Sequence, residues 1–327
     1  MLWRLLMAIA IGSAFLSGVQ AADGQAFTDP AKAGPDFAIQ GEYQGSIKSP
    51  DQEIKVGAQV IALGDGKFRG VFYFGGLPGD GWNRGDMQLA ADGTTEDGKI
   101  VFAGDTGKAI IEGGKMSIVD PGDNTIATLE KVERTSPTMG AKAPEGAKIL
   151  FDGTNADAWR GGKIVDGNLL LAGTLSKDEF QDFTLHIEFR TPFVPKATGQ
   201  GRGNSGLYLQ NRYECQILDS FGLEGLNNEC GGFYQIKEPA VNMCYPPLSW
   251  QTYDVDFTAA RFEGDKKVKN ARVSIKHNGV PIYEDFELPN LTPGGYPKEA
   301  PGKGPFQLQA HGNPVTYRNI WVVEKKS

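Results

Sequence analysis

The residues from Phe183 to Arg190 alternate strictly between apolar and polar side chains, and this short segment constrains the fold more than any other. A period of two gives an extended strand one apolar face and one polar face, which the 3.6-residue turn of a helix would not do. Almost no segment of the chain has a helical period, and many short runs end at glycine or Asn-Gly turns. The sequence therefore predicts an all-β protein.

The first half of the chain, residues 36–132, predicts a small antiparallel β domain. Its apolar runs are separated by residue pairs that favour hairpin turns, and a lysine follows each pair to open the next run. These pairs are Asp65-Gly66, Asp97-Gly98 and Gly113-Gly114. Residues 133–147 contain two prolines and no apolar periodicity, so we expect them to form a linker.

Residues 148–327 continue the β pattern, and they predict a sandwich of two large sheets with one concave, polar face. Asn278-Gly279 lies between two apolar runs and is a strong hairpin signal. The predicted strands include residues 183–190, 207–210, 213–218, 232–235, 252–258, 271–277 and 316–323.

The chain opens on a pattern typical of a secretory signal peptide, which we predict over residues 1–22. Arg4 precedes an apolar run over residues 5–16, and the small-residue sequence Val19-Gln20-Ala21 follows the run. The run is shorter than the roughly 20 apolar residues that a spanning helix needs. We therefore expect an exported protein, secreted or periplasmic, that does not bind a membrane.

Composition and local context exclude several classes of function. The chain has 33 basic and 40 acidic residues and a formal net charge of −7, which disfavours nucleic acid and anionic membranes as partners. Gly201, Gly203 and Gly206 have the spacing of a dinucleotide-binding fingerprint, but a strand rather than a helix is predicted after them. We therefore expect no organic cofactor.

Three cysteines are present, and their spacing does not match a zinc site. An oxidising compartment favours pairing two of them. We expect a disulfide between Cys230 and Cys244, and we place Cys215 in the core because it lies on the apolar side of its predicted strand.

The main functional signal lies between residues 203 and 219. In the predicted strand, Glu214 and Gln216 share one face, while Tyr213, Cys215 and Ile217 take the other. A carboxylate beside an amide on a polar sheet face is typical of a sugar site, so we expect a small saccharide or glycoside as ligand.

The spacing of Glu214, Gln216 and Asp219 is similar to the E-x-D-x-x-E strand of laminarinase-like glycoside hydrolases. In that strand a bulge brings the last carboxylate to the face of the first. A retaining mechanism needs two carboxyl groups about 5 to 5.5 Å apart. One interpretation is therefore a retaining glycosidase that uses Glu214 and Asp219.

A wider set of stretches extends over the C-terminal half of the chain. In order they read ILFDGT at 149–154, DFTLHIEFR at 182–190, GNSGLYL at 203–209, YECQILD at 213–219, WQTYD at 250–254, LQAHG at 308–312 and YRNI at 317–320. Together they resemble the 3-keto-disaccharide hydrolase family, over residues 146 to 325. The resemblance implies a concanavalin A-like sandwich, or jelly roll, and does not include the N-terminal β domain.

This resemblance implies cleavage of 3-keto-glycosides by removal of the C2 proton, elimination of the C1 substituent and addition of water. Glu214 is implied as base or acid, and His311 as its proton-transfer partner or as a donor to the keto oxygen. Arg190 or a bound divalent metal ion would stabilise the enolate. The predicted substrate contacts are Glu188, Arg190, Asn204, Gln216 and Trp250.

Two positions depart from the family pattern. Ala310 stands where an aspartate often precedes the histidine, and Gln210 stands where many members have arginine. Loss of these polar groups leaves three interpretations: a 3-keto-glycoside enzyme, the retaining glycosidase, and a non-catalytic carbohydrate-binding module. In the third, Asn204, Glu214 and Gln216 would bind sugar hydroxyls while Trp250 stacks on the ring.

Overall fold

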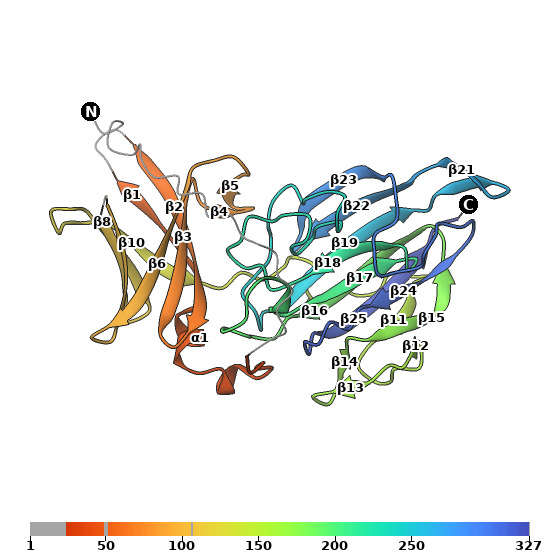
Figure 1. Ribbon diagram of the computed structural model, residues 1–327, viewed down its shortest axis with the longest axis horizontal. Helices are drawn as coiled ribbons and strands as arrows, with labels where there is room; N and C mark the ends of the chain where they lie inside the picture. The colour runs from red at the N-terminus through yellow and green to blue at the C-terminus, as the bar shows by residue number, and fades with distance from the viewer. Residues whose placement is uncertain (1–23, 49–51, 106, 327) are drawn as a thin grey trace. The chain divides into compact units, whose positions relative to one another are not determined.

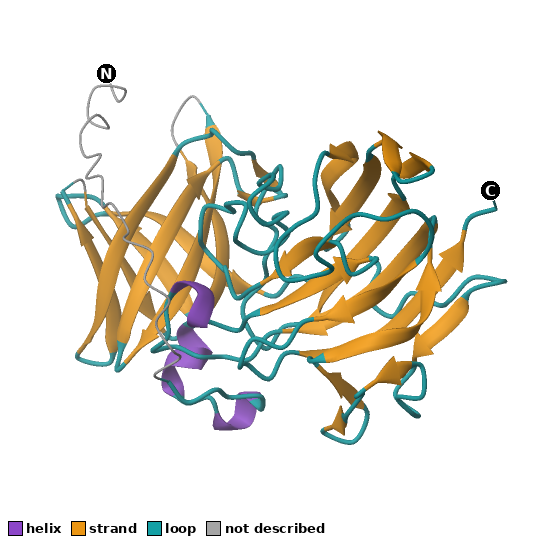
Figure 2. Cartoon of the chain, turned by 45° about the vertical axis from the view of Figure 1, so that its right-hand side comes forward, coloured by secondary structure: helices purple, strands orange, loops and turns teal. Residues whose placement is uncertain are grey.

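The computed structural model describes residues 24–48, 52–105 and 107–326, and these are almost entirely β-strands and loops (Figures 1 and 2). They form two compact units. The first comprises residues 34–133 and 195–201, and the second comprises residues 24–33, 134–194 and the chain from 202 onward. The all-β prediction is confirmed. The predicted signal peptide lies outside the described residues.

Eight antiparallel strands of the first unit close into a barrel in the order β1-β10-β9-β8-β7-β6-β3-β2. Closure leaves these strands without a free edge. The three predicted turn pairs have positive φ at both residues, as hairpin turns of type I′ require. The barrel strands are β1 (Gly41–Lys48), β2 (Glu53–Gly64), β3 (Lys67–Phe74), β6 (Gln88–Glu96), β7 (Lys99–Gly104), β8 (Gly107–Glu112), β9 (Lys115–Val119) and β10 (Thr125–Val132). The unit also contains α1 (Pro35–Ile39), β4 (Leu77–Pro78), β5 (Gly81–Trp82) and a 3-10 helix at Gly199–Gly201.

The second unit is a sandwich of an eight-stranded and a five-stranded antiparallel sheet. The larger sheet has the order β13 (Ile164–Val165), β14 (Leu169–Leu171), β25 (Thr316–Glu324), β16 (Phe183–Arg190), β19 (Gln251–Thr258), β22 (Ala271–His277) and β23 (Val280–Leu288), with β11 (Lys148–Phe151) beside β25. The smaller sheet has the order β12 (Trp159–Arg160), β15 (Thr174–Phe180), β24 (Gly304–Leu308), β17 (Ser205–Leu209) and β18 (Tyr213–Ile217). A hairpin of β20 (Arg261–Glu263) and β21 (Lys266–Lys269) and a 3-10 helix at Pro30–Lys32 complete the unit.

Aromatic side chains from both sheets form the core of the sandwich. The apolar residues of β16 are at most 2% exposed, and the ring of Phe183 meets Phe306 of β24 edge-on, with centroids 4.8 Å apart. Burying a large apolar side chain contributes about 1.5–3 kcal/mol, and such a ring pair adds about 1 kcal/mol. The apolar side of the predicted alternation at residues 183–190 therefore faces the opposite sheet.

Two local predictions are wrong. Residues 232–235 form no strand, and Phe233 makes only isolated bridges with Cys215 and Lys237. The chain makes a tight turn there that only glycine fits, because a Cβ at Gly232 would lie 2.4 Å from the Asn227 carbonyl oxygen. The first strand of the Glu214 hairpin ends at Leu209, and Gln210 begins the turn with a φ of 54°.

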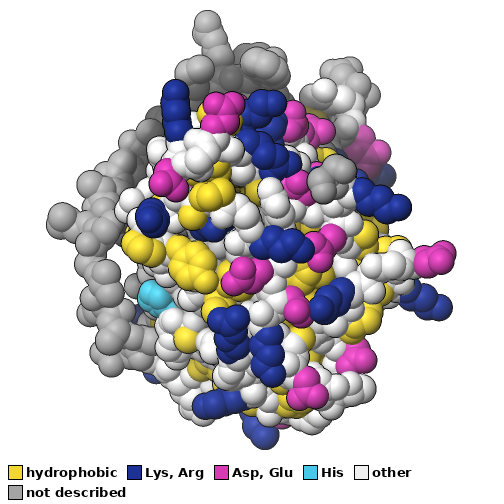
Figure 3. Space-filling model, turned by 90° about the vertical axis from the view of Figure 1, so that its right-hand side faces the viewer, with side chains coloured by type: hydrophobic (Ala, Val, Ile, Leu, Met, Phe, Trp, Pro, Cys, Tyr) yellow, Lys and Arg dark blue, Asp and Glu magenta, His cyan; other side chains and the backbone are white. Residues whose placement is uncertain are grey.

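The surface of the sandwich mixes charges of both signs. On the face shown in Figure 3, basic and acidic side chains are interspersed. Ion pairs of the sandwich surface include Arg272–Asp285 at 2.6 Å, Lys303–Glu324 at 2.6 Å and Lys325–Asp256 at 2.5 Å. Exposed pairs of this kind contribute little to stability. Within the described part of the chain, no helix has the length and apolar character needed to cross a membrane.

Candidate active site

Glu214 and Gln216 lie on the outer face of the five-stranded sheet. The alternate residues of β18 are fully buried in the core, where the ring of Tyr213 lies 5.8 Å from that of Phe257 on the opposite sheet. Glu214 and Gln216 are each only 3% exposed, because other segments pair with the edge of β18. The Glu214 amide donates to Thr292 Oγ1 at 2.7 Å, and the Gln216 amide donates to the Gly232 carbonyl oxygen at 2.9 Å.

The carboxylate of Glu214 lies directly over Gly206 of the neighbouring strand. A Cβ built on Gly206 would be 2.2 Å from Glu214 Oε1, so only glycine leaves room for the carboxylate at this point. Tyr208, two residues further along β17, is the direct cross-strand partner of Glu214. Gly206 and Tyr208 of β17 are therefore the cross-strand neighbours of the Glu214 side chain.

Three segments meet at the hydroxyl of Tyr208. The hydroxyl donates to the Pro293 carbonyl oxygen at 2.8 Å and accepts a hydrogen bond from Gln309 Nε2 at 3.3 Å. A Cβ on Gly294 would lie 2.5 Å from the same oxygen, so the loop can approach this closely only with glycine there. Tyr208, Gln309 and the 293–294 loop form one wall beside Glu214.

The surroundings of Glu214 shift its protonation toward neutral pH. Burial raises the pKa of Glu214 to about 7, and a hydrogen bond with Tyr208 opposes this rise. Burial and the nearby Glu214 carboxylate raise the pKa of Tyr208, so its hydroxyl keeps its proton. A carboxyl group with a pKa near the working pH can both take and return a proton during a reaction.

Asp219 lies in a different environment from Glu214. It is 2% exposed, follows the end of β18, and accepts a hydrogen bond from Arg202 Nε at 2.6 Å. Burial raises the pKa of Asp219, and the Arg202 guanidinium opposes that shift. The carboxylate is engaged in a buried ion pair, whereas a nucleophile in a retaining glycosidase has to reach the sugar.

The remaining predicted residues of this half of the site lie near the start of β17 and the end of β24. Asn204 is 1% exposed, and its amide donates to Asn313 Oδ1 at 2.9 Å. His311 is exposed in the turn between β24 and β25 that also holds Asn313. The structure thus joins the Asn204 segment to the His311 turn by a hydrogen bond.

Glu188, Arg190 and Trp250 lie on the other side of the sandwich. Glu188 and Arg190 are on the outer face of the eight-stranded sheet, in β16, and Trp250 directly precedes β19. The guanidinium carbons of Arg190 and Arg318 lie 5.0 and 4.0 Å from the centroid of the Trp250 ring. The structure therefore does not bring these three predicted substrate contacts together with Glu214.

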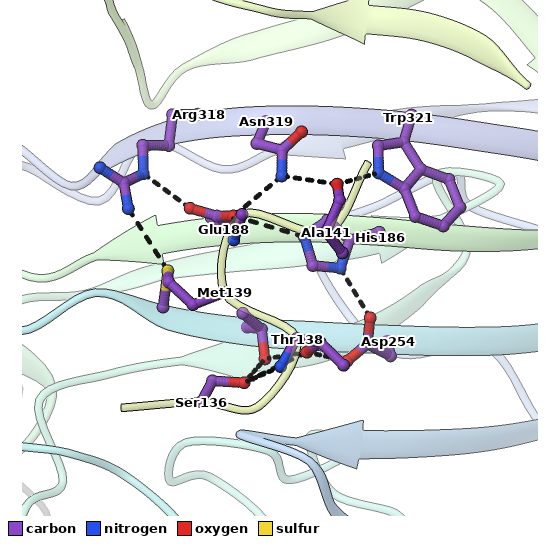
Figure 4. A network of polar contacts seen from close by, with 12 residues as sticks. Ser136, Thr138, Met139, Ala141, His186, Glu188, Asp254, Arg318, Asn319 and Trp321 are labelled. Carbon is purple, nitrogen blue, oxygen red and sulfur yellow. Dashed lines mark hydrogen bonds and ion pairs between the residues drawn. The ribbon is translucent and has the colours of Figure 1, made fainter. Parts of the chain in front are cut away.

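Glu188 holds a segment that we call the strap, residues 136–141, against the eight-stranded sheet (Figure 4). Its carboxylate accepts hydrogen bonds from the Gly140 amide at 2.6 Å, Arg318 Nε at 2.6 Å and Asn319 Nδ2 at 2.8 Å. These bonds and the neighbouring His186 outweigh burial and lower the pKa of Glu188 to about 2. Glu188 is thus a structural carboxylate that is ionised at neutral pH.

The expected disulfide is wrong. All three cysteines are buried and unbonded. Cys230 Sγ lies 3.2 Å from the Tyr253 hydroxyl, and Cys244 Sγ donates to the Leu218 carbonyl oxygen at 3.4 Å. The two thiols also interact with each other, but as thiols and not as a disulfide. Cys215 lies in the core as predicted.

Among the residues that the structure describes, no group of three or more His, Cys, Asp or Glu side chains could hold an ion. At Glu214 the neighbouring polar groups include the Tyr208 hydroxyl and, bonded to that hydroxyl, the Gln309 side chain. The Glu214 site is suited to hydrogen bonding and proton transfer.

Comparison with known proteins identifies the sandwich. Residues 146–323, more than half of the chain, match the model of the 3-keto-alpha-glucoside-1,2-lyase-like domain. The chain belongs to this family. Apart from residues 195–201, the matched residues belong to the sandwich unit, and all eight barrel strands lie outside the family domain, as the sequence resemblance implied.

Solved structures provide a second comparison for this chain. One protein of Parabacteroides distasonis, provisionally named a glycosyl hydrolase, is 32% identical, covers 56% of this chain and 85% of its own, and has a TM-score of 0.51. A second protein of that organism, named in the same way, is 17% identical, covers 56% of this chain and 95% of its own, and has a TM-score of 0.41. No functionally curated protein matches. The family and the first neighbour support a glycoside-acting enzyme.

Sequence reasoning missed the residues that surround Glu214 in this family domain. Gly206 and Tyr208 lie within the stretch that carries the resemblance, and strand pairing of 205–209 with 213–217 could have placed both beside Glu214. Nothing in the sequence indicated Thr292, Pro293 and Gly294. They lie about 80 positions from β17 and β18 along the chain, and no local pattern predicts contacts at that separation.

Proposed function

We propose that this protein cleaves the glycosidic bond of 3-keto-glycosides, with Glu214 as the base that removes the proton at C2. The observation that carries the proposal is the environment of Glu214, a nearly buried carboxyl group whose pKa burial raises to about 7. A carboxylate with an ordinary pKa is a weaker base than one near neutrality. Family membership supports the choice of a keto sugar as substrate.

The proposed reaction proceeds in balanced steps. The C2–H bond breaks, the proton passes to a Glu214 carboxylate oxygen, and the electron pair forms the enolate of the C3 ketone. The enolate re-forms the ketone and expels the C1 oxygen, which takes a proton as it leaves. Water then adds at C1 and gives its second proton to the group that protonated the leaving oxygen, while Glu214 returns its proton to C2.

The other residues have supporting roles in this proposal. Gln216 shares the sheet face of Glu214 and would bind a sugar hydroxyl, and Asn204 would do the same from the start of β17. His311 is exposed and would protonate the leaving oxygen. The enolate oxygen would need hydrogen-bond donors near Glu214, because Arg190 lies on the opposite side of the sandwich.

A reaction in D2O tests the chemistry directly. The protein is incubated with a 3-keto-glucoside and, separately, with the parent glucoside, and the products are examined by NMR. We expect cleavage of the keto form alone, with deuterium at C2 of the product, because Glu214 exchanges its proton with solvent between the two steps. Cleavage of the parent glucoside without deuterium at C2 would indicate a retaining glycosidase instead.

Glu214→Gln tests the residue. Removing a general base typically lowers the rate by about 100- to 10,000-fold, and we expect kcat to fall within that range. Glu42→Gln is the matched control, because Glu42 is also buried, at 2% exposure, but lies in the barrel. Saccharide binding by the unmodified protein with no turnover of either substrate would favour the carbohydrate-binding module.

Export of the protein and a bound divalent metal ion that stabilises the enolate both remain predictions. Detection of the protein outside the cytoplasm with a new N-terminus after residue 22 would support export. Activity that survives dialysis against a chelator would argue against a required metal ion.

A further inference from the structure

The hydroxyl of Tyr208 is a polar group beside Glu214 with several close neighbours. Tyr208 is fully buried, and its hydroxyl has the Pro293 carbonyl oxygen at 2.8 Å, Gln309 Nε2 at 3.3 Å and the Glu214 carboxyl group as polar neighbours. No described step of the proposed reaction uses this group. Its position is nevertheless as tightly defined as that of Glu214 itself.

The proton of this hydroxyl has two competing acceptors. A tyrosine hydroxyl has one proton to donate and can accept further hydrogen bonds. The Gln309 amide nitrogen only donates, so the proton can point either to the Pro293 carbonyl oxygen or to an ionised Glu214. When Glu214 carries a proton, it becomes a donor itself, and the Tyr208 oxygen becomes its acceptor.

We propose that Tyr208 is a positioning residue that stabilises both protonation states of Glu214 by turning its hydroxyl proton between Glu214 and the Pro293 carbonyl oxygen. This inference rests on the proposed role of Glu214 as a base. Before the C2 proton is removed, Tyr208 donates to the ionised carboxylate. Afterwards the new O–H of Glu214 donates to Tyr208, whose proton turns to Pro293. The O–H bond of Tyr208 never breaks.

The surroundings of Tyr208 fix its oxygen so that only the proton has to move. Residues on either side of Tyr208 belong to β17, which pairs with β18 and with β24. Gln309, just after β24, donates a hydrogen bond to the Tyr208 oxygen, and Gly294 lies so close to this oxygen that it limits movement of the side chain. Rotation of a hydroxyl proton requires no rearrangement of the chain, so the acceptor can change as fast as Glu214 gains or loses its proton.

The proposal is tested by the titration of Glu214 in the free protein. In Tyr208→Phe the ionised carboxylate loses a hydrogen-bond donor, and we expect the pKa of Glu214 to rise by about one. The measurement is the carboxyl carbon shift of labelled glutamate against pH, assigned with Glu214→Gln. Tyr213→Phe is the matched control, because it removes a buried hydroxyl bonded to Glu299 from the opposite face of the same hairpin.

A second measurement uses the protein without any change at Tyr208. The ring carbon that carries the Tyr208 hydroxyl should titrate with the same midpoint as Glu214, and this titration should vanish in Glu214→Gln. An unchanged Glu214 pKa in Tyr208→Phe, an equal rise in Tyr213→Phe, or a Tyr208 signal that ignores Glu214 would each overturn the proposal. None of these readouts needs turnover, so the failure of the proposed reaction would be recognised separately.

Discussion

At the scale of single residues, the missing side chain of Gly206 decides where Glu214 can lie. The carboxylate occupies the place of a Cβ, 2.2 Å from its calculated position. Gly206 has no positive φ, so alanine is conformationally allowed there and even favours the strand. The site thus depends on a glycine for space and not for backbone freedom.

Gly206→Ala should therefore damage activity and spare the fold. The new methyl group pushes the Glu214 carboxylate away from its position, and a displacement of about 1 Å can cost about 100-fold in rate. We expect kcat/KM on a 3-keto-glucoside to fall by about that factor with an unchanged melting temperature. Gly104→Ala in the barrel, whose Cβ would meet its nearest neighbour at 3.5 Å, should keep full activity.

At the scale of elements, a bulge in β25 determines how the strap is held. The pairing of β16 with β25 shifts register between His186 and Glu188, and Asn319 has a φ of 44° at this point. Arg318 and Asn319 can consequently both reach Glu188. His186 of β16 is the cross-strand partner of Asp254, and its Nδ1 lies 2.6 Å from Asp254 Oδ1. Asp254 also accepts a hydrogen bond from the Thr138 hydroxyl of the strap.

The stability of this network should depend on the charge of His186. Burial alone would lower the pKa of His186, but the Asp254 and Glu188 carboxylates outweigh burial and raise it. A raised pKa gives stabilisation that is fully present below the ordinary value of about 6.5 and lost as the pH rises through the folded-state pKa. We expect the free energy of unfolding, measured in urea, to fall above pH 6.5.

His186→Gln tests this dependence at the level of the network. Removing the cation leaves two carboxylates without their bridge, which costs about 3 kcal/mol, and we expect that loss at pH 6 together with a flatter dependence above it. His311→Gln, at an exposed position, should leave the dependence intact. An equally steep fall in His186→Gln would show that another group titrates.

At the scale of the whole molecule, buried carboxyl groups with opposite pKa shifts set the pH of greatest stability. Glu214 is protonated in the folded protein up to a pKa of about 7, whereas its ordinary pKa is 4.5, so stability falls as the pH rises between these values. Glu188 has a pKa of about 2, so its contribution is present above 4.5 and lost as the pH falls. Both effects together favour a maximum near pH 5.

The contribution of Glu214 can be separated by mutation. Its ionisation should cost on the order of 3 kcal/mol between pH 4.5 and 7.5, and Glu214→Gln should remove that loss while it removes activity. The measurement is the free energy of unfolding of the sandwich against pH, followed by tryptophan fluorescence. A variant that kept the full decline would mean that Glu214 titrates at an ordinary pKa.

Much of the fold could be predicted because its signals are local. The alternation at residues 183–190 gave a strand with the same bounds as β16, and the turn pairs of the barrel have the backbone angles that their residues favour. Closure of the barrel was not predictable, because pairing of β1 with β10 joins residues 84 to 90 positions apart, from Gly45–Leu129 to Glu42–Val132. The sequence also missed that the strap is bonded to the sandwich.

By itself, the sequence determined most of the β-strands, the face of β18 that carries Glu214, and the family. Only the tertiary structure decided which polar groups share a site. It placed Tyr208, Gln309 and the 293–294 loop around Glu214, paired Asp219 with Arg202, and put Glu188 under the strap. The physical reason is that alternation fixes a side chain's face locally, whereas burial and pKa depend on segments that only packing brings together.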